Sequence, residues 1–225
     1  MRDRDLAPLV GVLLAGGESR RFGSPKPLAR LGSTTFGARV GRALAETCDS
    51  IAIAGAGPLP PELEAWPRVA DAPGIRGPIA GILGAMAAYP SRAVLAVACD
   101  QPLLRGEHLR WLVAQRSAGA LGVFVRFDES RIQPLPGIYE PAAAAALAEL
   151  ARAGGSLQPF GERNDVVFAV PPAELAPGWT SVDTEERRRE LEAALHEEHP
   201  DPAGVSEPKG VERPTIVERL RGRVD

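Results

Sequence analysis

Short apolar runs that alternate with segments of helical spacing are the feature that most constrains the fold of this chain. Three such runs, at residues 10–15, 50–54 and 93–98, come before residue 100. Between them, apolar residues recur at helical intervals at residues 34–47 and after Gly77-Pro78. Strands that alternate with helices are typical of a parallel sheet with helices on both faces. We therefore expect an α/β fold with three layers and a mostly parallel central sheet.

The second half of the chain continues this alternation less regularly. We expect a helix at 107–116, strands at 121–127 and 132–139 joined by a polar turn, a helix at 141–153, a strand at 165–170 and a helix at 184–197. Residues 199–210 then contain three prolines and show no hydrophobic periodicity, as expected of a linker or a flexible tail. The sequence therefore predicts one domain over residues 1–196 and a flexible Pro-rich, charged tail over residues 197–225.

Charge and composition exclude several classes of protein. The formal net charge of −3 leaves no basic surplus for a nucleic-acid backbone, so we expect no nucleic-acid partner. No apolar run approaches the ~18 to 20 residues of a membrane span, so we expect no membrane partner. Two cysteines, Cys48 and Cys99, indicate neither a disulfide framework nor a cysteine metal site. These features favour a soluble, cytoplasmic enzyme.

A glycine-rich segment follows the first apolar run, at residues 14–26. Its paired glycines, Gly16 and Gly17, allow a ligand to approach the backbone, and successive amide groups there can bind an anion. Arg21 and Lys26 can add full positive charge against phosphates. Lys26 is the only lysine before residue 197, in a chain that otherwise uses arginine. The alternative is a simple turn followed by a solvated lysine.

Two other phosphate-binding motifs do not fit this chain. A Walker loop needs lysine directly after its last glycine, whereas Gly16 is followed by Gly17 and Glu18. A dinucleotide fingerprint would place a third glycine at position 60, which is Pro60. Neither a P-loop hydrolase nor a nicotinamide oxidoreductase is therefore predicted.

Two aspartates are further candidates for contact with a ligand. Asp100 ends the third apolar run, where it could join phosphate oxygens in holding Mg²⁺ or could instead cap a turn ahead of Pro102. Asp71 lies in a Pro/Gly loop before a predicted helix N-terminus. It could bond a base or ribose, and it could equally be a turn former.

These segments resemble a known family. Residues 14–26 resemble the signature of nucleotidyltransferases that share a Rossmann-like, glycosyltransferase-A-type fold. Within that superfamily the chain is most similar to the molybdenum cofactor guanylyltransferases, because Gly-Pro-Ile-Ala-Gly at 77–81, Cys-Asp-Gln-Pro at 99–102 and the segment 133–139 match in order and spacing. The resemblance spans roughly residues 10–195.

The resemblance implies a reaction and a role for each matched residue. It implies Mg²⁺-dependent transfer of GMP from GTP to the phosphate of molybdopterin, with release of pyrophosphate. The implied nucleotide-binding residues are Leu14, Ala15, Gly16, Gly17, Lys26, Asp71 and Asp100. The implied catalytic residues are Lys26, Asp100 and Arg21, with Asp100 as the metal ligand. Proteins that mature molybdoenzymes are further expected partners.

Some positions depart from the family pattern. Pro25 and Gln101 also occur in related cytidylyltransferases, and Gly55 stands where the family often has asparagine. Near the last predicted helix the family often has Asn-x-Asn-Thr, whereas residues 181–184 read Ser-Val-Asp-Thr. The alternatives are therefore a related transferase that uses CTP or another phosphorylated acceptor, and a nucleotide-binding protein that has lost catalysis.

Overall fold

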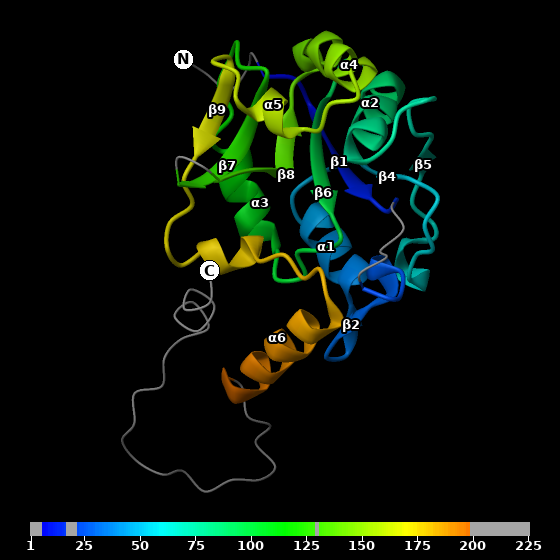
Figure 1. Cartoon of the computed structure of the whole chain (residues 1–225), viewed down its shortest axis with the longest axis vertical. Coiled ribbons are helices and arrows are strands. Elements are labelled where there is room, and N and C mark those ends of the chain that lie inside the picture. The colour runs from blue at the N-terminus through cyan, green and yellow to red at the C-terminus, as the bar shows by residue number, and fades with distance from the viewer. Residues whose placement is uncertain (1–5, 17–21, 129–130, 199–225) are drawn as a thin grey trace, which may run out of the picture.

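The computed structural model describes residues 6–16, 22–128 and 131–198 of the chain (Figure 1). Within these residues a seven-stranded sheet has the order β5-β4-β1-β6-β8-β7-β9. Its strands are β1 (Leu9–Leu14), β4 (Ile51–Ala54), β5 (Arg68–Val69), β6 (Ala93–Ala98), β7 (Gly122–Asp128), β8 (Arg131–Tyr139) and β9 (Val166–Ala169). Only β8 runs antiparallel to its neighbours among these strands, so the expected mostly parallel sheet is confirmed.

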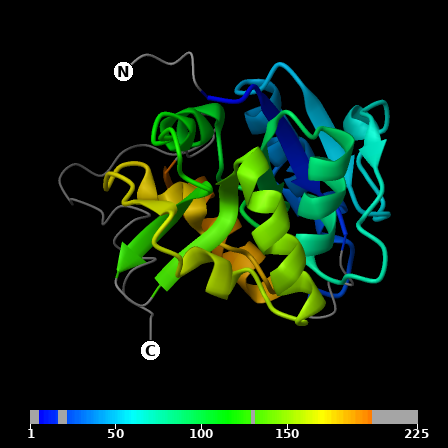
Figure 2. The same cartoon turned by 90° about the horizontal axis from the view of Figure 1, so that it is seen from above.

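Helices cover both faces of this sheet, as the alternation predicted. The helices are α1 (Phe36–Ala45), α2 (Pro78–Ala88), α3 (Gly106–Val113), α4 (Ala144–Arg152), α5 (Gln158–Gly161) and α6 (Glu185–Glu198). Helices α1 and α3 pack side by side on one face, and α2 and α4 do so on the other (Figure 2). None of the helices in the described residues is long and apolar enough to cross a membrane.

The sheet separates two apolar cores, and β1 contributes to both. Val10, Val12 and Leu14 are buried in the core on the α2 and α4 side. Leu13 and Ala15 are buried in the core on the α1 and α3 side. This period of two is that of a strand covered on both faces, so the run reads as continuously apolar in sequence.

The differences from the predicted elements are small. Helix α6 runs to Glu198, two residues past the expected domain boundary, and the rest of the predicted tail, residues 199–225, lies outside the described residues. The strands β2 (Arg30–Leu31), β3 (Thr34–Thr35) and β5 were not predicted. Each has two residues, which is too short to show a hydrophobic period.

Helix α2 packs closely against the loop after β5 at Gly84, so the substitution Gly84→Ala tests this packing. A Cβ at Gly84 would lie 2.0 Å from the carbonyl oxygen of Ala70. Helix propensity alone predicts that Gly84→Ala stabilises the protein by about 1 kcal/mol. Because the clash is with backbone, we expect instead a loss of about 2 kcal/mol in the free energy of unfolding, measured by urea denaturation.

Gly41→Ala in α1 is the matched control for that substitution. A Cβ at Gly41 would lie 2.7 Å from Cδ2 of Leu63, which is the end of a flexible side chain and can move. We expect a clearly smaller loss of stability for Gly41→Ala. Stability of Gly84→Ala equal to or above that of the unsubstituted protein would contradict the packing described here.

Candidate active site

The ends of two adjacent parallel strands form the first part of the site. Leu14 at the end of β1 is paired in register with Ala98 at the end of β6. The segments that follow these strands therefore emerge side by side, and a cavity of about 220 Å³ opens between them. Its lining includes Leu14, Ala15, Gly16, Lys26 and Asp100. Five of the residues that the sequence singled out are thus brought together.

A second cavity, of about 290 Å³, adjoins the first. The two cavities share Leu14, Gly16 and Ala98 as lining residues. The second cavity is also lined by Asp71 and by Gly77, which precedes the first residue of α2. Asp71 therefore lies across Gly16 from the Lys26 side of the site, and the N-terminus of α2 opens beside it. An elongated ligand could span both cavities.

Gly55 shows why the backbone at Gly16 needs glycine neighbours. Gly55 has a φ of 96°, and a Cβ there would lie 2.5 Å from the backbone nitrogen of Gly16. Gly57 crosses just as closely, since a Cβ would lie 2.0 Å from the carbonyl oxygen of Ala15. The loop after β4 thus packs directly against the backbone of Ala15 and Gly16. This contact explains glycine at position 55, where the resembled family often has asparagine.

Lys26 lies between two carboxylates. Its Nζ donates a hydrogen bond to Oδ1 of Asp183 at 2.5 Å, and it also acts electrostatically on Asp100. The segment that carries Asp183 is held to the site by the backbone, because the N–H of Val182 donates to the carbonyl oxygen of Asp100 at 2.7 Å. Asp100, Lys26 and Asp183 therefore form one cluster, of which Lys26 and Asp100 line the first cavity.

Asp183 is the site residue that sequence reasoning did not select. The only signal was that Ser181 to Thr184 aligned with a family motif and departed from it. No strand ends at Asp183, so the rule that located Asp100 could not locate it.

Burial raises the pKa of the Asp100 carboxyl above its usual range. The negative charge of Asp183 adds to this rise, whereas Lys26 and the backbone at Asp100 oppose it. The ionised form of Asp100 is therefore incompletely compensated, and a further cation at the cluster would stabilise it. No group of three or more His, Cys, Asp or Glu side chains suited to a metal occurs within the described parts of the chain. Mg²⁺ is typically bound by one or two carboxylates together with oxygen atoms of a phosphate ligand, and this cluster can supply the two carboxylates.

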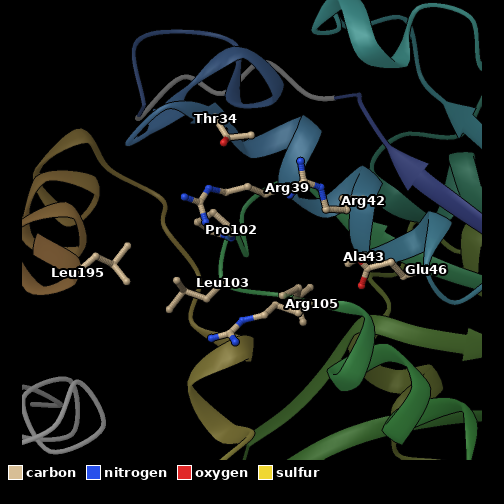
Figure 3. Close-up of a pocket in the computed structure, with 10 residues that line it drawn as sticks. Thr34, Arg39, Arg42, Ala43, Glu46, Pro102, Leu103, Arg105 and Leu195 are labelled. Atoms are coloured by element: carbon tan, nitrogen blue, oxygen red, sulfur yellow. The ribbon is translucent and has the colours of Figure 1, made fainter. Parts of the chain in front are cut away.

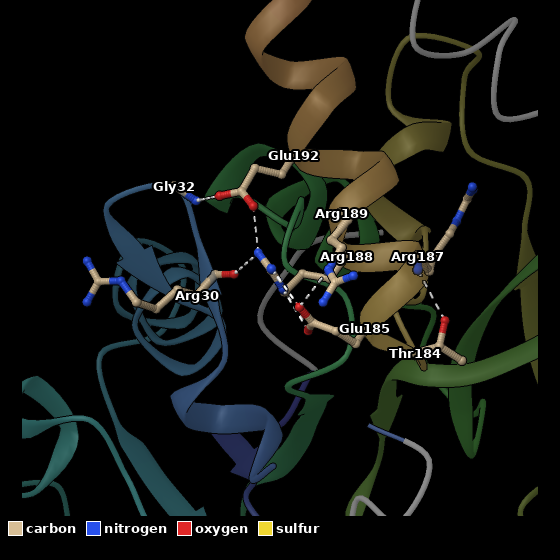
Figure 4. A network of polar contacts seen from close by, with 8 residues as sticks. All are labelled: Arg30, Gly32, Thr184, Glu185, Arg187, Arg188, Arg189 and Glu192. Carbon is tan, nitrogen blue, oxygen red and sulfur yellow. Dashed lines mark hydrogen bonds and ion pairs between the residues drawn. The ribbon is translucent and has the colours of Figure 1, made fainter. Parts of the chain in front are cut away.

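Helix α6 is anchored by a network of ion pairs next to this cluster (Figure 4). The guanidinium of Arg188 binds the carboxylates of Glu185 and Glu192 and donates to the carbonyl oxygen of Arg30. Glu192 also accepts a hydrogen bond from the N–H of Gly32 at 3.0 Å. The β2–β3 hairpin, which follows Lys26 along the chain, is thereby fixed to the helix that follows Asp183.

The neighbours of Asp100 support it without taking part in nucleophilic chemistry. Cys99 is buried, and burial raises the pKa of its thiol to about 12, so the thiol stays protonated at neutral pH. The amide nitrogen of Gln101 donates to the carbonyl oxygens of Leu135 and Trp179. Gln101 thus ties the end of β6 to β8 and to the segment before α6.

Two of the expected site residues are not placed by the structure. Gly17 and Arg21 lie outside the described residues. A larger hollow of about 510 Å³ contains none of the expected site residues and lies elsewhere, between α1 and α6 (Figure 3).

The sequence of this chain is similar to those of known nucleotidyltransferases. The sequence model of the MobA-like NTP transferase domain matches residues 11–167. A probable molybdenum cofactor guanylyltransferase of Opitutus terrae is 32% identical over 200 residues, which cover 82% of this chain and 96% of that protein. A molybdenum cofactor biosynthesis bifunctional protein of Synechocystis is 29% identical over 147 residues, which cover 63% of this chain and 42% of that protein. The chain thus matches less than half of the bifunctional relative.

A solved structure shares the fold over most of the chain. It is the crystal structure of molybdopterin-guanine dinucleotide biosynthesis protein A from Archaeoglobus fulgidus. The TM-score is 0.69 at 20% sequence identity, and the similarity covers 84% of this chain and 99% of that one. At this identity the comparison establishes the fold alone.

Proposed function

The chain belongs to the MobA-like NTP transferase family, and from this premise we propose that it is a molybdenum cofactor guanylyltransferase. The proposed reaction is attack by the terminal phosphate of molybdopterin on the α-phosphate of GTP. Pyrophosphate leaves, and the guanine dinucleotide form of the cofactor is the product. The nucleotidyltransferase class follows from the family, whereas GTP, Mg²⁺ and molybdopterin belong to the proposal.

The observation that carries the proposal is the convergence of Lys26, Asp100 and Asp183 beside the turn at Gly16. Nucleotidyl transfer needs little covalent chemistry from a protein, which mainly positions the reactants and neutralises charge. Lys26 supplies a compact positive charge at the cavity that adjoins the turn. No protein nucleophile is needed, which agrees with the protonated thiol of Cys99.

The residues of the cluster fit a divalent metal ion. Asp100 and Asp183 would hold it, and bound Mg²⁺ would polarise the α-phosphate and neutralise charge on the leaving pyrophosphate. Burial is the main cause of the raised pKa of Asp100, and a bound metal ion would stabilise its ionised form. The ammonium of Lys26 donates to Asp183, and Lys26 lines the first cavity, where it can bind the triphosphate.

The second cavity supports guanine as the base. Guanine presents two adjacent N–H donors on one edge, and a carboxylate can accept both. Asp71 lines this cavity and is exposed toward it. We propose that Asp71 binds the guanine edge and that Leu14, Ala15 and Gly16 hold the nucleotide through their backbone. Gly17 and Arg21 keep the nucleotide-binding and phosphate-binding roles that the sequence resemblance implies.

Pyrophosphate release measured with GTP, CTP and ATP in Mg²⁺, with and without molybdopterin, tests the proposal. We expect release with GTP only, and only when molybdopterin is present. A preference for CTP would assign the chain to the related activity that Pro25 and Gln101 suggest. Release with none of the three nucleotides would contradict the proposed reaction.

Asp71→Asn tests the assignment of the base. An amide offers one acceptor and one donor group, so it cannot accept both guanine N–H groups. We expect kcat/KM for GTP to fall by about 10-fold, with a smaller change for CTP, since each good bidentate contact to a base contributes about 1–3 kcal/mol of discrimination. Equal effects on both nucleotides would instead assign Asp71 to the ribose or to the loop.

A further inference from the structure

The largest of the hollows named above is lined by arginines and lies apart from the nucleotide cavities. It has a volume of about 510 Å³ and lies between α1, the segment before α3, and α6 (Figure 3). Arg39 and Arg42 of α1 line it, and so does Arg105, which immediately precedes α3. None of its lining residues lines either nucleotide cavity. Its volume is within the range of small-molecule sites.

The three arginines are poorly neutralised by their surroundings. Burial lowers the pKa of Arg39, and repulsion by Arg42 and Arg105 lowers it further. Of the lining residues, Glu46 alone carries a negative charge. Arg105 contacts Glu107 at 3.5 Å, but both side chains are at least half exposed, so water screens that pair. The hollow therefore holds an excess of positive charge.

One buried hydrogen-bond donor in this hollow has no partner within the described residues. The Nη2 of Arg39 donates to the carbonyl oxygen of Leu31 at 3.0 Å, but its Nε is buried and has no acceptor in the part of the chain that the structure describes. The guanidinium of Arg42 is exposed and makes no hydrogen bond or ion pair within that part, so a ligand can reach it. A buried donor without an acceptor is costly to a protein, and its presence calls for an explanation.

We propose that this hollow is a second anion site, which binds the phosphate of a small phosphorylated molecule. The guanidinium forks of Arg39, Arg42 and Arg105 match the geometry of phosphate oxygens, and a phosphate would supply the missing acceptors and negative charge. Leu103, beside Arg105, and Leu195 on α6 add apolar lining, against which an organic body can pack (Figure 3). This inference does not depend on the reaction proposed above.

Isothermal titration calorimetry with inorganic pyrophosphate and with GMP tests the second site. Lys26→Ala serves as the background for every titration, because Lys26 is the residue proposed to bind phosphate at the nucleotide cavity. We expect this background to bind at least one of the two ligands. Adding Arg42→Ala and Arg105→Ala should weaken that binding by at least 10-fold. Both arginines are exposed, so these substitutions should leave the fold intact by circular dichroism.

Arg152→Ala in the same background is the matched control. Arg152 is also a helix arginine, but it lies at the end of α4 and does not line the hollow. We expect this control to bind like the background. Tighter binding of pyrophosphate would identify a diphosphate ligand, and tighter binding of GMP would identify a phosphate ester. Equal affinities with and without Arg42 and Arg105, or no binding in the background, would overturn the proposal.

Discussion

Asp100→Asn is expected to lower kcat/KM for nucleotidyl transfer by about 10³-fold, in the range seen when one charge-stabilising group is removed from an active site. The substitution keeps the shape of the side chain and removes the negative charge that would hold the metal ion. Because Asp100 lies two residues after the end of β6 and its carbonyl oxygen accepts a hydrogen bond from the N–H of Val182, the change should leave the cavity in place. Pyrophosphate release from GTP and molybdopterin measures the effect.

The same substitution is expected to stabilise the folded protein at neutral pH. The pKa of Asp100 is raised in the folded state, so the folded protein binds this proton more tightly than the unfolded chain does. Stability is therefore lost as the pH rises from the unfolded pKa through the folded pKa, and the loss is complete above it. Asp100→Asn removes that loss. Its midpoint of urea denaturation should exceed that of the unsubstituted protein at pH 7, with little difference at pH 3.

Loss of activity together with a gain in stability would separate a functional role from misfolding. Asp49→Asn is a suitable control, because Asp49 is exposed and lies outside both nucleotide cavities. It should change neither activity nor the pH dependence of stability by a comparable amount. A protein that has lost catalysis and acts only by binding would show the stability gain of Asp100→Asn without any activity to lose.

The positions of Gly16 and Asp100 could be predicted because both follow buried apolar runs. The carboxyl ends of parallel strands meet at one edge of a sheet, so a glycine turn and an aspartate after two such runs belong to one site. Lys26 could be predicted from its rarity in an arginine-rich chain. Each of these inferences needed only local sequence and the parallel topology.

Asp183 could not be predicted in this way, because tertiary contacts alone bring it to the site. It lies on a segment with no hydrophobic period, far from Asp100 in sequence. The hydrogen bond from the N–H of Val182 to the carbonyl oxygen of Asp100 holds Asp183 at the site, and the interactions of Arg188 hold the helix that follows. The hollow lined by arginines could not be predicted for the same reason, because Arg39 and Arg105 lie in separate parts of the sequence.

Lys26→Met is expected to lower kcat/KM by about 10² to 10³-fold, because it removes the positive charge that binds the triphosphate in the proposed mechanism. Much of the loss should come from a higher KM for GTP, since a charge that binds the substrate phosphates also acts before the transition state. Lys26→Arg keeps the charge but replaces a point charge with a planar fork, so it should recover only part of the activity. Full activity of Lys26→Met would contradict the assignment.

The acid limb of the pH profile of kcat/KM gives a second test of this cluster, because two variants should shift it in opposite directions. Lys26 lowers the pKa of Asp100 in the folded protein, and Asp183 raises it. Lys26→Met should therefore move the acid limb to higher pH, because the Asp100 carboxylate loses its cation. Asp183→Asn should move the limb to lower pH, because a neighbouring negative charge is removed. The acid limb of kcat/KM reports the free enzyme, so these shifts measure the cluster as it stands before substrate binds. Shifts of the same sign in both variants would show that the two residues act on activity through the fold, whereas opposite shifts require that both charges act on Asp100.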